Sequence, residues 1–188
     1  MADKNSRTKS NILNATISIL GEEEDISTIT IRRIAQRAGV GLGSINYHFR
    51  SKENLLNQAV LSLMGDTAAI WIESSKDMQK YPVERLKILF KEILKIALQY
   101  PDLFKVSIKY DLLQGNMNTS KIIAPVFKKV FGNKKDDKEI NLIAFQAITT
   151  MQVMLLRADD FKSFSGIDIY DENERDKYID LLIENITQ

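Results

Sequence analysis

Residues 37–55, RAGVGLGSINYHFRSKENL, place three glycines within five residues, ahead of a tyrosine, the single histidine of the chain and two cations. Glycines at this density usually end a helix. Apolar residues at helical spacing nevertheless flank them on both sides. We therefore expect a short, sharply turned connection between two helices at this point of the chain.

Two short helices are expected around these glycines. Thr30 is a natural N-cap for the first helix, which closes at Gly39. The apolar face of this helix consists of Ile31, Ile34, Ala35 and Ala38. After the turn, Val40 and Ile45 can enter the same small core, and the residues expected to point elsewhere are Gly41, Leu42, Gly43, Ser44, Asn46 and Tyr47. This is the plan of a helix-turn-helix, whose second helix lies in the major groove of DNA.

The residue types in this stretch suit an approach to DNA. Gly39 allows the positive φ of the turn, while Gly41 and Gly43 remove side chains from a surface that must come close to a duplex. Ser51 caps a third helix, whose positive N-terminal end favours a phosphate. The side chains that can hydrogen-bond to bases or phosphates are Ser44, Asn46, Tyr47, His48 and Lys52.

The charge distribution supports the same interpretation. The formal net charge of the 188 residues is only +1, but residues 1–52 carry eight basic residues against five acidic ones. Between Thr30 and Lys52 there are five cations and no acid. A nearly neutral total therefore hides a basic segment of the kind that contacts nucleic acid.

Composition excludes several other classes of site. The absence of cysteine and the single histidine exclude disulfides, thiolate metal sites and a histidine-rich metal centre. No phosphate-binding loop or catalytic constellation occurs, so we expect neither a cofactor nor an enzyme. The N-terminus lacks the apolar core of a signal peptide, and apolar runs elsewhere fall short of the roughly 18 residues of a membrane span. We expect a soluble, cytoplasmic protein.

The chain as a whole is predicted to be all-α. Apolar residues recur three or four apart, with few alternating β-branched runs. Helices are expected over residues 7–20, 83–100, 102–113, 120–131, 138–157 and 174–186, and a longer one begins after Lys52 and runs toward Ile72. Pro82 and Pro101 mark helix starts, and Gly115 and Gly132 mark helix ends. The segment 161–170 is expected to loop over the helical bundle.

The last two long helices carry broad apolar faces. One consists of Ile140, Ile143, Ala144, Ala147, Ile148, Met151, Met154 and Leu155, and the other of Tyr178, Ile179, Leu182, Ile183 and Ile186. Two such pairs can form a four-helix interface in a homodimer. The alternative is that both faces close the core of a monomer.

The segments TIRRIAQRAGV at residues 30–40 and INYHFRSKENL at residues 45–55 resemble the N-terminal domain of tetracycline-repressor (TetR) family regulators. The resemblance covers about the first 55 residues. It implies an all-α homodimer with a helix-turn-helix DNA-binding domain in residues 1–52 and a larger helical domain for effector binding and dimerisation in residues 53–188. Such a regulator binds a near-palindromic operator in double-stranded DNA and leaves it when a small molecule occupies the C-terminal domain.

The resemblance also implies which residues contact DNA. Position 46 is often aromatic in the family, whereas the asparagine of this chain could make a bidentate contact to adenine. The implied contacts are Thr30, Arg32, Leu42, Gly43, Ser44, Asn46, Tyr47, His48 and Lys52.

Several of these assignments have structural alternatives. His48 could hold the core of the domain together. For Arg33 and Arg37, a position on a solvated helix face is the preferred interpretation over a DNA contact. For Tyr47, a functional role is the preferred interpretation, because Ile45 and Phe49 already supply the apolar face of this helix. An adaptor protein on the same fold, without DNA binding, is the alternative function. Activation in place of repression also stays open, because polarity depends on where the operator lies.

Bulky side chains of the C-terminal domain are candidates for the lining of an effector cavity, which would suit a hydrophobic molecule. For each of them, ordinary core packing is the competing interpretation. They are Trp71, Phe90, Phe104, Tyr110, Met117, Phe127, Phe145 and Met151.

Overall fold

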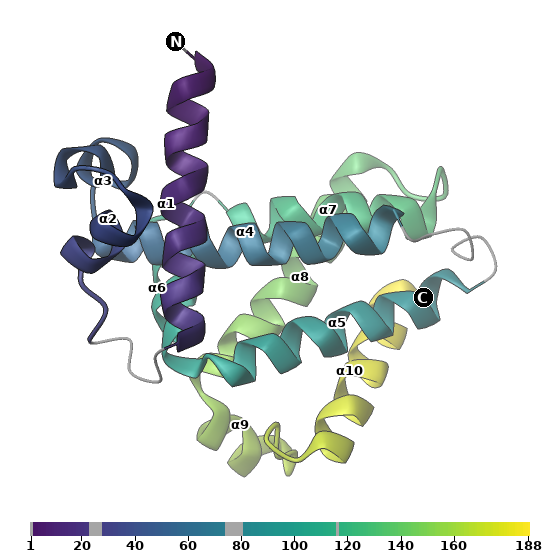
Figure 1. The fold of residues 1–188 in the computed structure, drawn as a ribbon. Helices are drawn as coiled ribbons and strands as arrows, with labels where there is room; N and C mark the ends of the chain where they lie inside the picture. Colours follow the sequence, from purple (N-terminus) through teal and green to yellow (C-terminus); the bar gives the residue numbers. More distant parts are fainter. Residues whose placement is uncertain (1, 23–27, 74–80, 116) are drawn as a thin grey trace. The chain divides into compact units, whose positions relative to one another are not determined.

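The fold is known from a computed structural model, which describes residues 2–22, 28–73, 81–115 and 117–188 (Figure 1). These residues form ten α-helices, and no strand occurs among them. The prediction of an all-α protein is therefore confirmed. The helices divide into two compact units, Met1–Leu63 with Tyr100–Gln114, and Met64–Gln99 with Gly115–Gln188.

The first unit is built on the helix-turn-helix. It contains α1 (Ala2–Glu22), α2 (Ile31–Ala38), α3 (Leu42–Phe49), the first part of α4 (Lys52–Glu73) and α6 (Pro101–Leu113). Helix α1 packs against both α2 and α3. The core between these helices includes the fully buried side chains of Ile12, Ile19, Ile34, Ile45 and Phe49. This apolar cluster holds the two short helices, which are too short to be stable alone.

The second unit is a larger bundle. It contains the end of α4 with α5 (Pro82–Gln99), α7 (Asn118–Phe131), α8 (Asp137–Leu156), α9 (Ala158–Ser165) and α10 (Glu172–Thr187). Helix α7 packs against α8 and α5, and α10 packs against α5 and α8. Asp136 begins α8 with a capping box, because its carboxylate accepts the Glu139 N–H at 2.9 Å and the Glu139 carboxylate accepts the Asp136 N–H at 2.8 Å.

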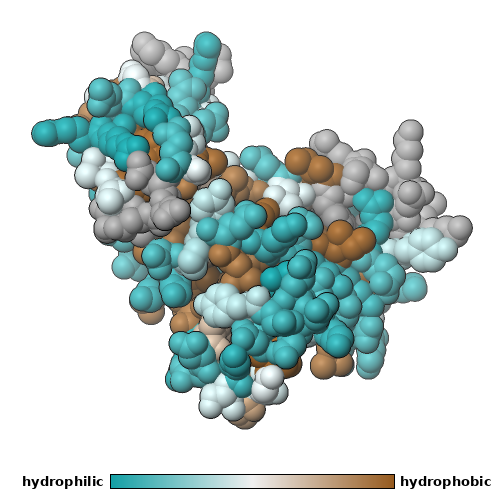
Figure 2. Space-filling view, turned by 60° about the horizontal axis from the view of Figure 1, so that its bottom comes forward, coloured by the Kyte–Doolittle hydropathy of each residue, from teal (hydrophilic) through white to brown (hydrophobic). Residues whose placement is uncertain are grey.

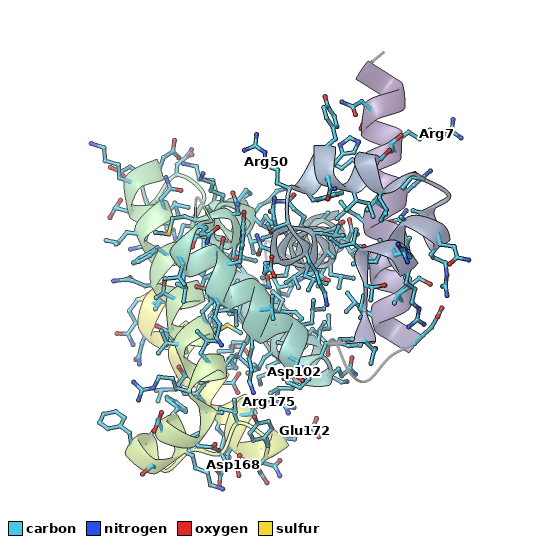
Figure 3. The ribbon with its side chains drawn as sticks, turned by 90° about the vertical axis from the view of Figure 1, so that its left-hand side faces the viewer. Arg7, Arg50, Asp102, Asp168, Glu172 and Arg175 are labelled. Carbon is cyan, nitrogen blue, oxygen red and sulfur yellow. The ribbon has the colours of Figure 1, made fainter. Side chains whose placement is uncertain are left out.

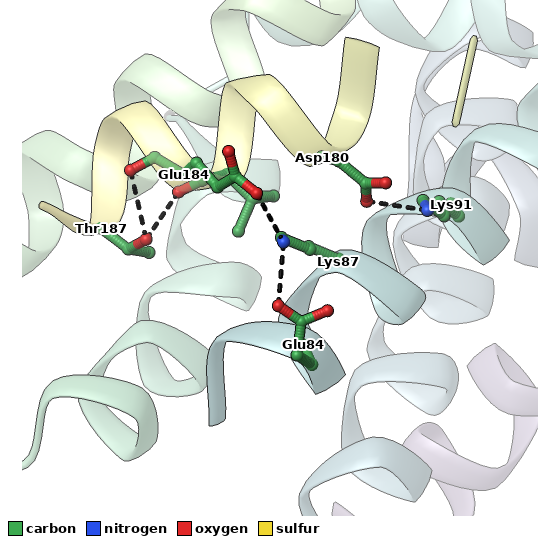
Figure 4. Close-up of polar contacts among 7 residues, drawn as sticks. Glu84, Lys87, Lys91, Asp180, Glu184 and Thr187 are labelled. Carbon is green, nitrogen blue, oxygen red and sulfur yellow. Dashed lines mark hydrogen bonds and ion pairs between the residues drawn. The ribbon is translucent and has the colours of Figure 1, made fainter. Parts of the chain in front are cut away.

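A row of ion pairs joins α5 to α10 (Figure 4). Lys87 Nζ lies 2.8 Å from both Glu84 Oε1 and Glu184 Oε1, and Lys91 Nζ lies 2.7 Å from Asp180 Oδ1. The Lys87 ammonium group donates hydrogen bonds to the carboxylates of Glu184 and Glu84, and these bonds raise its pKa above the usual value. Residues four apart lie on one face of a helix, so the two lysines face the two acids of α10 in register.

The packing units divide the chain differently from the sequence. The predicted functional boundary follows residue 52, whereas the structure divides α4 between Leu63 and Met64 and groups α6 with the N-terminal helices. Helix α6 has a buried face that includes Leu103 and Ile108, and its Ser107 hydroxyl donates to Asn57 Oδ1 of α4 at 2.8 Å. The boundary between a DNA-binding and an effector-binding domain concerns function and stays a prediction.

The segment 161–170, expected to be a loop, is helical in its first half. Residues 158–165 form α9, which ends at Gly166 with φ 75°. The Phe161 ring contacts the Tyr178 ring of α10 edge to face, with 5.2 Å between centroids, while Phe164 is 91% exposed. A salt bridge of 2.6 Å from Lys162 Nζ to Asp168 Oδ2 joins α9 to the following turn. The sequence concealed this helix because its apolar residues do not form a buried stripe.

Helix α8 is the one helix, among the described residues, with the length and mean hydropathy of a membrane span. The same test is passed by the core helices of proteins without a membrane segment, and the buried face of α8 lies against α7. In the view of Figure 2, hydrophobic residues form separate patches between hydrophilic ones. We therefore assign α8 to the core of the second unit.

Candidate nucleic-acid interface

Helices α2 and α3 are delimited by the residues that the sequence indicated. The Thr30 hydroxyl accepts the Arg33 N–H at 3.2 Å and caps α2, and Gly39 ends that helix in the left-handed conformation, with φ 66° and ψ 33°. Gly41 has extended backbone, with φ −74° and ψ 153°, and is the N-cap of α3. The predicted helix-turn-helix is therefore confirmed in its local geometry.

Helix α3 presents an exposed face and a buried face. Ile45 and Phe49 are buried in the core of the unit. Leu42 and Tyr47 are 43% and 72% exposed, and Gly43 and Asn46 are exposed with them. This exposed face therefore offers a leucine, a glycine, an asparagine and a tyrosine to a partner outside the chain.

Gly43 is not required by the internal packing of the unit. A Cβ atom added at this position would meet no other atom within 4 Å, and its backbone has no positive φ. The same holds for Gly41. Neither glycine is needed for a turn of positive φ or for a close contact within the chain, so the open space above Gly43 is available to an external partner.

The nine residues implied as DNA contacts all lie in the first unit. Those at the surface are Thr30, Arg32, Leu42, Gly43, Asn46 and Tyr47, and those half-buried are Ser44, His48 and Lys52. The His48 ring lies between the neighbouring rings of Tyr47 and Phe49, with centroid distances of 5.1 and 6.0 Å. This partial burial is compatible with both interpretations of His48, a phosphate contact and a residue that braces the domain.

Arg37 makes a specific contact in addition to lying at the surface. Its two terminal nitrogens donate to the Glu22 carboxylate at 2.7 and 2.8 Å, and one of them also donates to the Ser18 hydroxyl at 3.1 Å. The hydrogen bond from Arg37 lowers the pKa of Glu22 from 4.5 to about 2. This bidentate pair joins the end of α2 to the end of α1, while Arg37 stays exposed, as expected for a solvated helix face.

The turn between α3 and α4 is held by a local network. The Ser51 hydroxyl accepts the Asn54 N–H at 3.1 Å, as expected for an N-cap. The Asn54 side-chain amide donates to the Phe49 carbonyl oxygen at 2.8 Å. These bonds place Lys52 in the first turn of α4, directly after the end of α3.

A buried polar pair, which the sequence did not indicate, joins α6 to α4. The Ser107 hydroxyl donates to Asn57 Oδ1 at 2.8 Å, and both side chains are buried. Asn57 Nδ2 is buried without a hydrogen-bond partner. Their sequence separation of 50 residues leaves no local pattern from which this contact could be found.

The residues considered for an effector cavity belong to both units. Phe104 and Tyr110 belong to the first unit, whereas the remaining described ones belong to the second, and the side chain of Trp71 lies outside the described part. Phe90 and Phe127 are fully buried, and their rings contact edge to face at 5.9 Å. Met151 is buried as well, while Met117 and Phe145 are 49% and 39% exposed. Phe90 and Phe127 thus pack as core residues.

Metal binding has no support in the described residues, among which no group of three or more His, Cys, Asp or Glu side chains could hold an ion. The exposed side chains around α2 and α3 include the Thr30 hydroxyl, the Arg32 guanidinium group and the Asn46 amide. Proteins contact nucleic acid through side chains of these kinds.

Comparisons with known proteins agree with this description. Residues 12–59 match the family described as "Bacterial regulatory proteins, tetR family". The nucleoid occlusion factor SlmA of Vibrio vulnificus (strain YJ016) is 24% identical over 127 residues, which are 68% of this chain and 64% of that protein. SlmA of Haemophilus ducreyi is 22% identical over 116 residues, 62% of this chain and 57% of that protein. The chain thus spans less than two thirds of the length of these relatives.

Two solved structures share the fold over nearly the whole chain. A TetR transcriptional regulator from Rhodococcus sp. RHA1 matches with a TM-score of 0.71 and 13% identity, covering 97% of both chains. The TetR family repressor AlkX from Dietzia sp. strain DQ12-45-1b matches with a TM-score of 0.70 and 11% identity, covering 95% of both chains. At these identities the likeness concerns the fold alone.

Proposed function

We propose that the chain regulates transcription by binding an operator through α3, because residues 12–59 match the tetR family of bacterial regulatory proteins, the family that residues 30–55 resemble. In this proposal the protein is a cytoplasmic repressor. It binds a near-palindromic site in double-stranded DNA as a homodimer and is released by a small hydrophobic effector. A catalytic activity is not part of the proposal.

The exposed face of α3 is the observation that carries the proposal. It combines a 72% exposed Tyr47, an exposed Asn46 and the open space above Gly43 in a segment without acidic residues. In a helix-turn-helix the N-terminal residues of the second helix meet base edges. We therefore assign base reading to Asn46 and Ser44, and phosphate contacts to the hydroxyl and cationic groups of Thr30, Arg32, Tyr47, His48 and Lys52. Leu42 and Gly43 form the close apolar approach to the bases.

The dimer is proposed to form through α8 and α10, on a different face from the one expected. The apolar residues predicted for the interface, such as Ile148 and Met151 of α8, are buried in the core of the single chain. The apolar side chains left at the surface are Leu142, Phe145 and Val153 on α8 and Leu181 on α10, which are 39–56% exposed. Their spacing of three, eight and eleven residues along α8 forms one stripe. A second copy of the chain would cover it in an isologous interface.

Release by an effector requires a connection between the two units. The chain passes from one unit to the other within α4, between α5 and α6, and between α6 and α7. Helix α6 is joined to α4 in the first unit by the Ser107–Asn57 hydrogen bond. An effector bound among the aromatic residues of the second unit would therefore act on α3 through α4 and α6. The coupling must be reciprocal, so operator DNA would weaken effector binding by the same factor.

Selection from a random pool of DNA duplexes tests the proposed function. The wild-type protein should enrich an inverted repeat and bind it with an affinity that falls as salt rises, because binding releases counterions from phosphates. Specific affinity should exceed that for a random duplex by about 10³-fold or more. A protein that enriches no sequence and binds no duplex, even at low salt, would instead support the adaptor function on the same fold.

A further inference from the structure

Arg50 occupies a strained backbone position between α3 and α4. Its φ is 64° and its ψ is −37°, and the Ser51 N–H donates to the Phe49 carbonyl oxygen at 2.7 Å across it. A hydrogen bond from residue i+2 to residue i around a positive φ defines a γ-turn of the rare, strained form. Among the described residues, Met117 is the only other non-glycine residue with a positive φ.

The connection between the helices imposes this conformation. The Arg50 N–H donates to the Asn46 carbonyl oxygen at 3.1 Å and closes α3, and Phe49 is fully buried. The Phe49 carbonyl oxygen accepts a second bond from Asn54. Glycine would adopt this turn at a lower cost, because it has no Cβ. Strain of this kind persists where the surrounding structure fixes it, and it occurs preferentially at functional positions.

The Arg50 side chain is free to act on an external ligand. It is exposed, and it makes no hydrogen bond or ion pair within the described part of the chain. Figure 3 shows it extending away from the ribbon, at the same end of the first unit as Arg7. No acidic residue lies between Thr30 and Lys52, so no neighbour along this segment neutralises its charge.

The position of Arg50 continues the exposed face of α3. Gly43, Asn46 and Tyr47 are exposed on α3, and Arg50 is exposed directly after the last turn of this helix. The eight residues of α3 extend for about 12 Å at 1.5 Å per residue, and the major groove is about 12 Å wide. If the N-terminal end of α3 meets base edges, its C-terminal end reaches the sugar–phosphate backbone at the groove edge.

We propose that Arg50 is a DNA-positioning residue, whose guanidinium group binds a backbone phosphate at the edge of the groove entered by α3. The inference rests on the proposed DNA-binding function. Arginine suits this role because its planar group can donate two parallel hydrogen bonds to a phosphate. The γ-turn directs this group outward, and the phosphate contact fixes how far α3 advances into the groove.

Three variants of the full-length protein test the proposal, with the duplex that the wild-type protein selects as the probe. Arg50→Gly removes the positive charge of the side chain and relieves the backbone strain. Arg50→Lys keeps the positive charge and the strained backbone. Met117→Gly is the matched control, because it relieves a positive φ in the second unit without a change of charge. Affinity is measured by fluorescence anisotropy at several salt concentrations, and the melting temperature by circular dichroism.

Arg50→Gly is expected to change affinity and stability in opposite directions. It should bind the duplex about tenfold more weakly at 0.1 M salt, and because a dimer would then neutralise two fewer phosphates, the slope of log K against log salt should decrease by about 1.8. Its melting temperature should rise by about 2–4 °C. Arg50→Lys should keep affinity within about threefold of wild type, since the cation remains. Met117→Gly should raise the melting temperature with unchanged affinity.

Two results would overturn the proposal while DNA binding by the wild type stands. One is an Arg50→Gly variant that binds the selected duplex with the wild-type affinity and salt slope. The other is a variant whose affinity and melting temperature fall together, since the weaker binding would then follow from impaired folding. Failure of the wild type to bind any duplex would overturn the proposed function, and the role of Arg50 with it.

Discussion

The buried pair between α4 and α6 leads to a prediction of stability. Ser107→Ala removes the hydroxyl that donates to Asn57 Oδ1 at 2.8 Å, from a side chain that is only 3% exposed. Asn57 is fully buried and its Nδ2 already has no partner, so the substitution leaves its whole amide unpaired in the interior. An unsatisfied buried polar group costs about 1–3 kcal/mol. For a chain of this size, about 2 kcal/mol lowers the melting temperature by about 4–8 °C.

A double variant decides whether the cost arises from the unpaired amide. Asn57→Leu combined with Ser107→Ala replaces both polar partners by apolar groups of similar size, which is close to neutral for stability. The double variant should therefore melt at a higher temperature than Ser107→Ala alone. Ser62→Ala in α4 is the control, because Ser62 is half-buried and makes no side-chain hydrogen bond within the described residues. Calorimetry at one fixed protein concentration measures all four proteins. A double variant less stable than Ser107→Ala would refute the reasoning.

Three further predictions follow from the site, the ion pairs and the apolar stripe. Lys52→Ala should weaken binding to selected and random duplexes alike and lower the salt slope by about 0.9 for each phosphate that is no longer neutralised, whereas Asn46→Ala should cost about 1–3 kcal/mol on the selected duplex alone. If Asn46→Ala loses the same binding free energy on the selected and the random duplex, Asn46 does not read the base sequence. The pKa of Glu22 is lowered to about 2 by Arg37, so their pair adds stability above about pH 4.5 and loses it as the pH falls through about 2. Glu22→Gln should thus melt below the wild type at pH 7, and the difference should shrink toward pH 2 in thermal scans. Leu142→Glu should convert the dimer to a folded monomer in light scattering, and an unchanged dimer would exclude this stripe from the interface.

Much of the fold could be predicted because its local signals are strong. Pro82 and Pro101 begin α5 and α6, and Gly39 and Gly132 follow the last residues of α2 and α7. Proline fits the first turn of a helix, where its missing N–H is not needed, and glycine tolerates the positive φ of a helix end. These preferences act within a few residues, so the sequence indicates them directly.

The sequence did not predict the start of α1, the presence of α9 or the grouping of α6. These features depend on exposed residues or on contacts between residues far apart in the sequence. Helix α1 begins at Ala2 instead of Arg7, because its first turns extend beyond the buried stripe that starts near Ile12. Helix α9 exposes Phe164, so its apolar residues gave no amphipathic pattern. The grouping of α6 with the N-terminal helices depends on packing across 50 residues of sequence, as between Asn57 and Ser107.

The candidate site was predictable in part. Its residue types and order predicted the family whose model matches residues 12–59, and the exposed and buried faces of α3 agree with the predicted alternation around Ile45 and Phe49. Arg50 could not be singled out, because arginine has no sequence preference for a positive φ and the γ-turn becomes visible only with the backbone. The effector residues stay a prediction, because aromatic side chains at helical spacing fill a core as readily as they line a cavity. Phe90 and Phe127 are examples of the former.

The absence of cysteine from the chain allows the central claim, that α3 enters the groove of DNA, to be measured directly. Leu42→Cys places a single thiol at the N-terminal end of α3, to which an iron chelate that cleaves nearby DNA can be attached. Phe164→Cys places the same group on α9, at a side chain that is 91% exposed. With the selected duplex, the chelate at position 42 should cleave at two symmetric positions about 34–36 Å apart, or a multiple of that distance, and the chelate at position 164 should give no localised cleavage. Localised cleavage from position 164, with none from position 42 while the duplex is bound, would contradict the account.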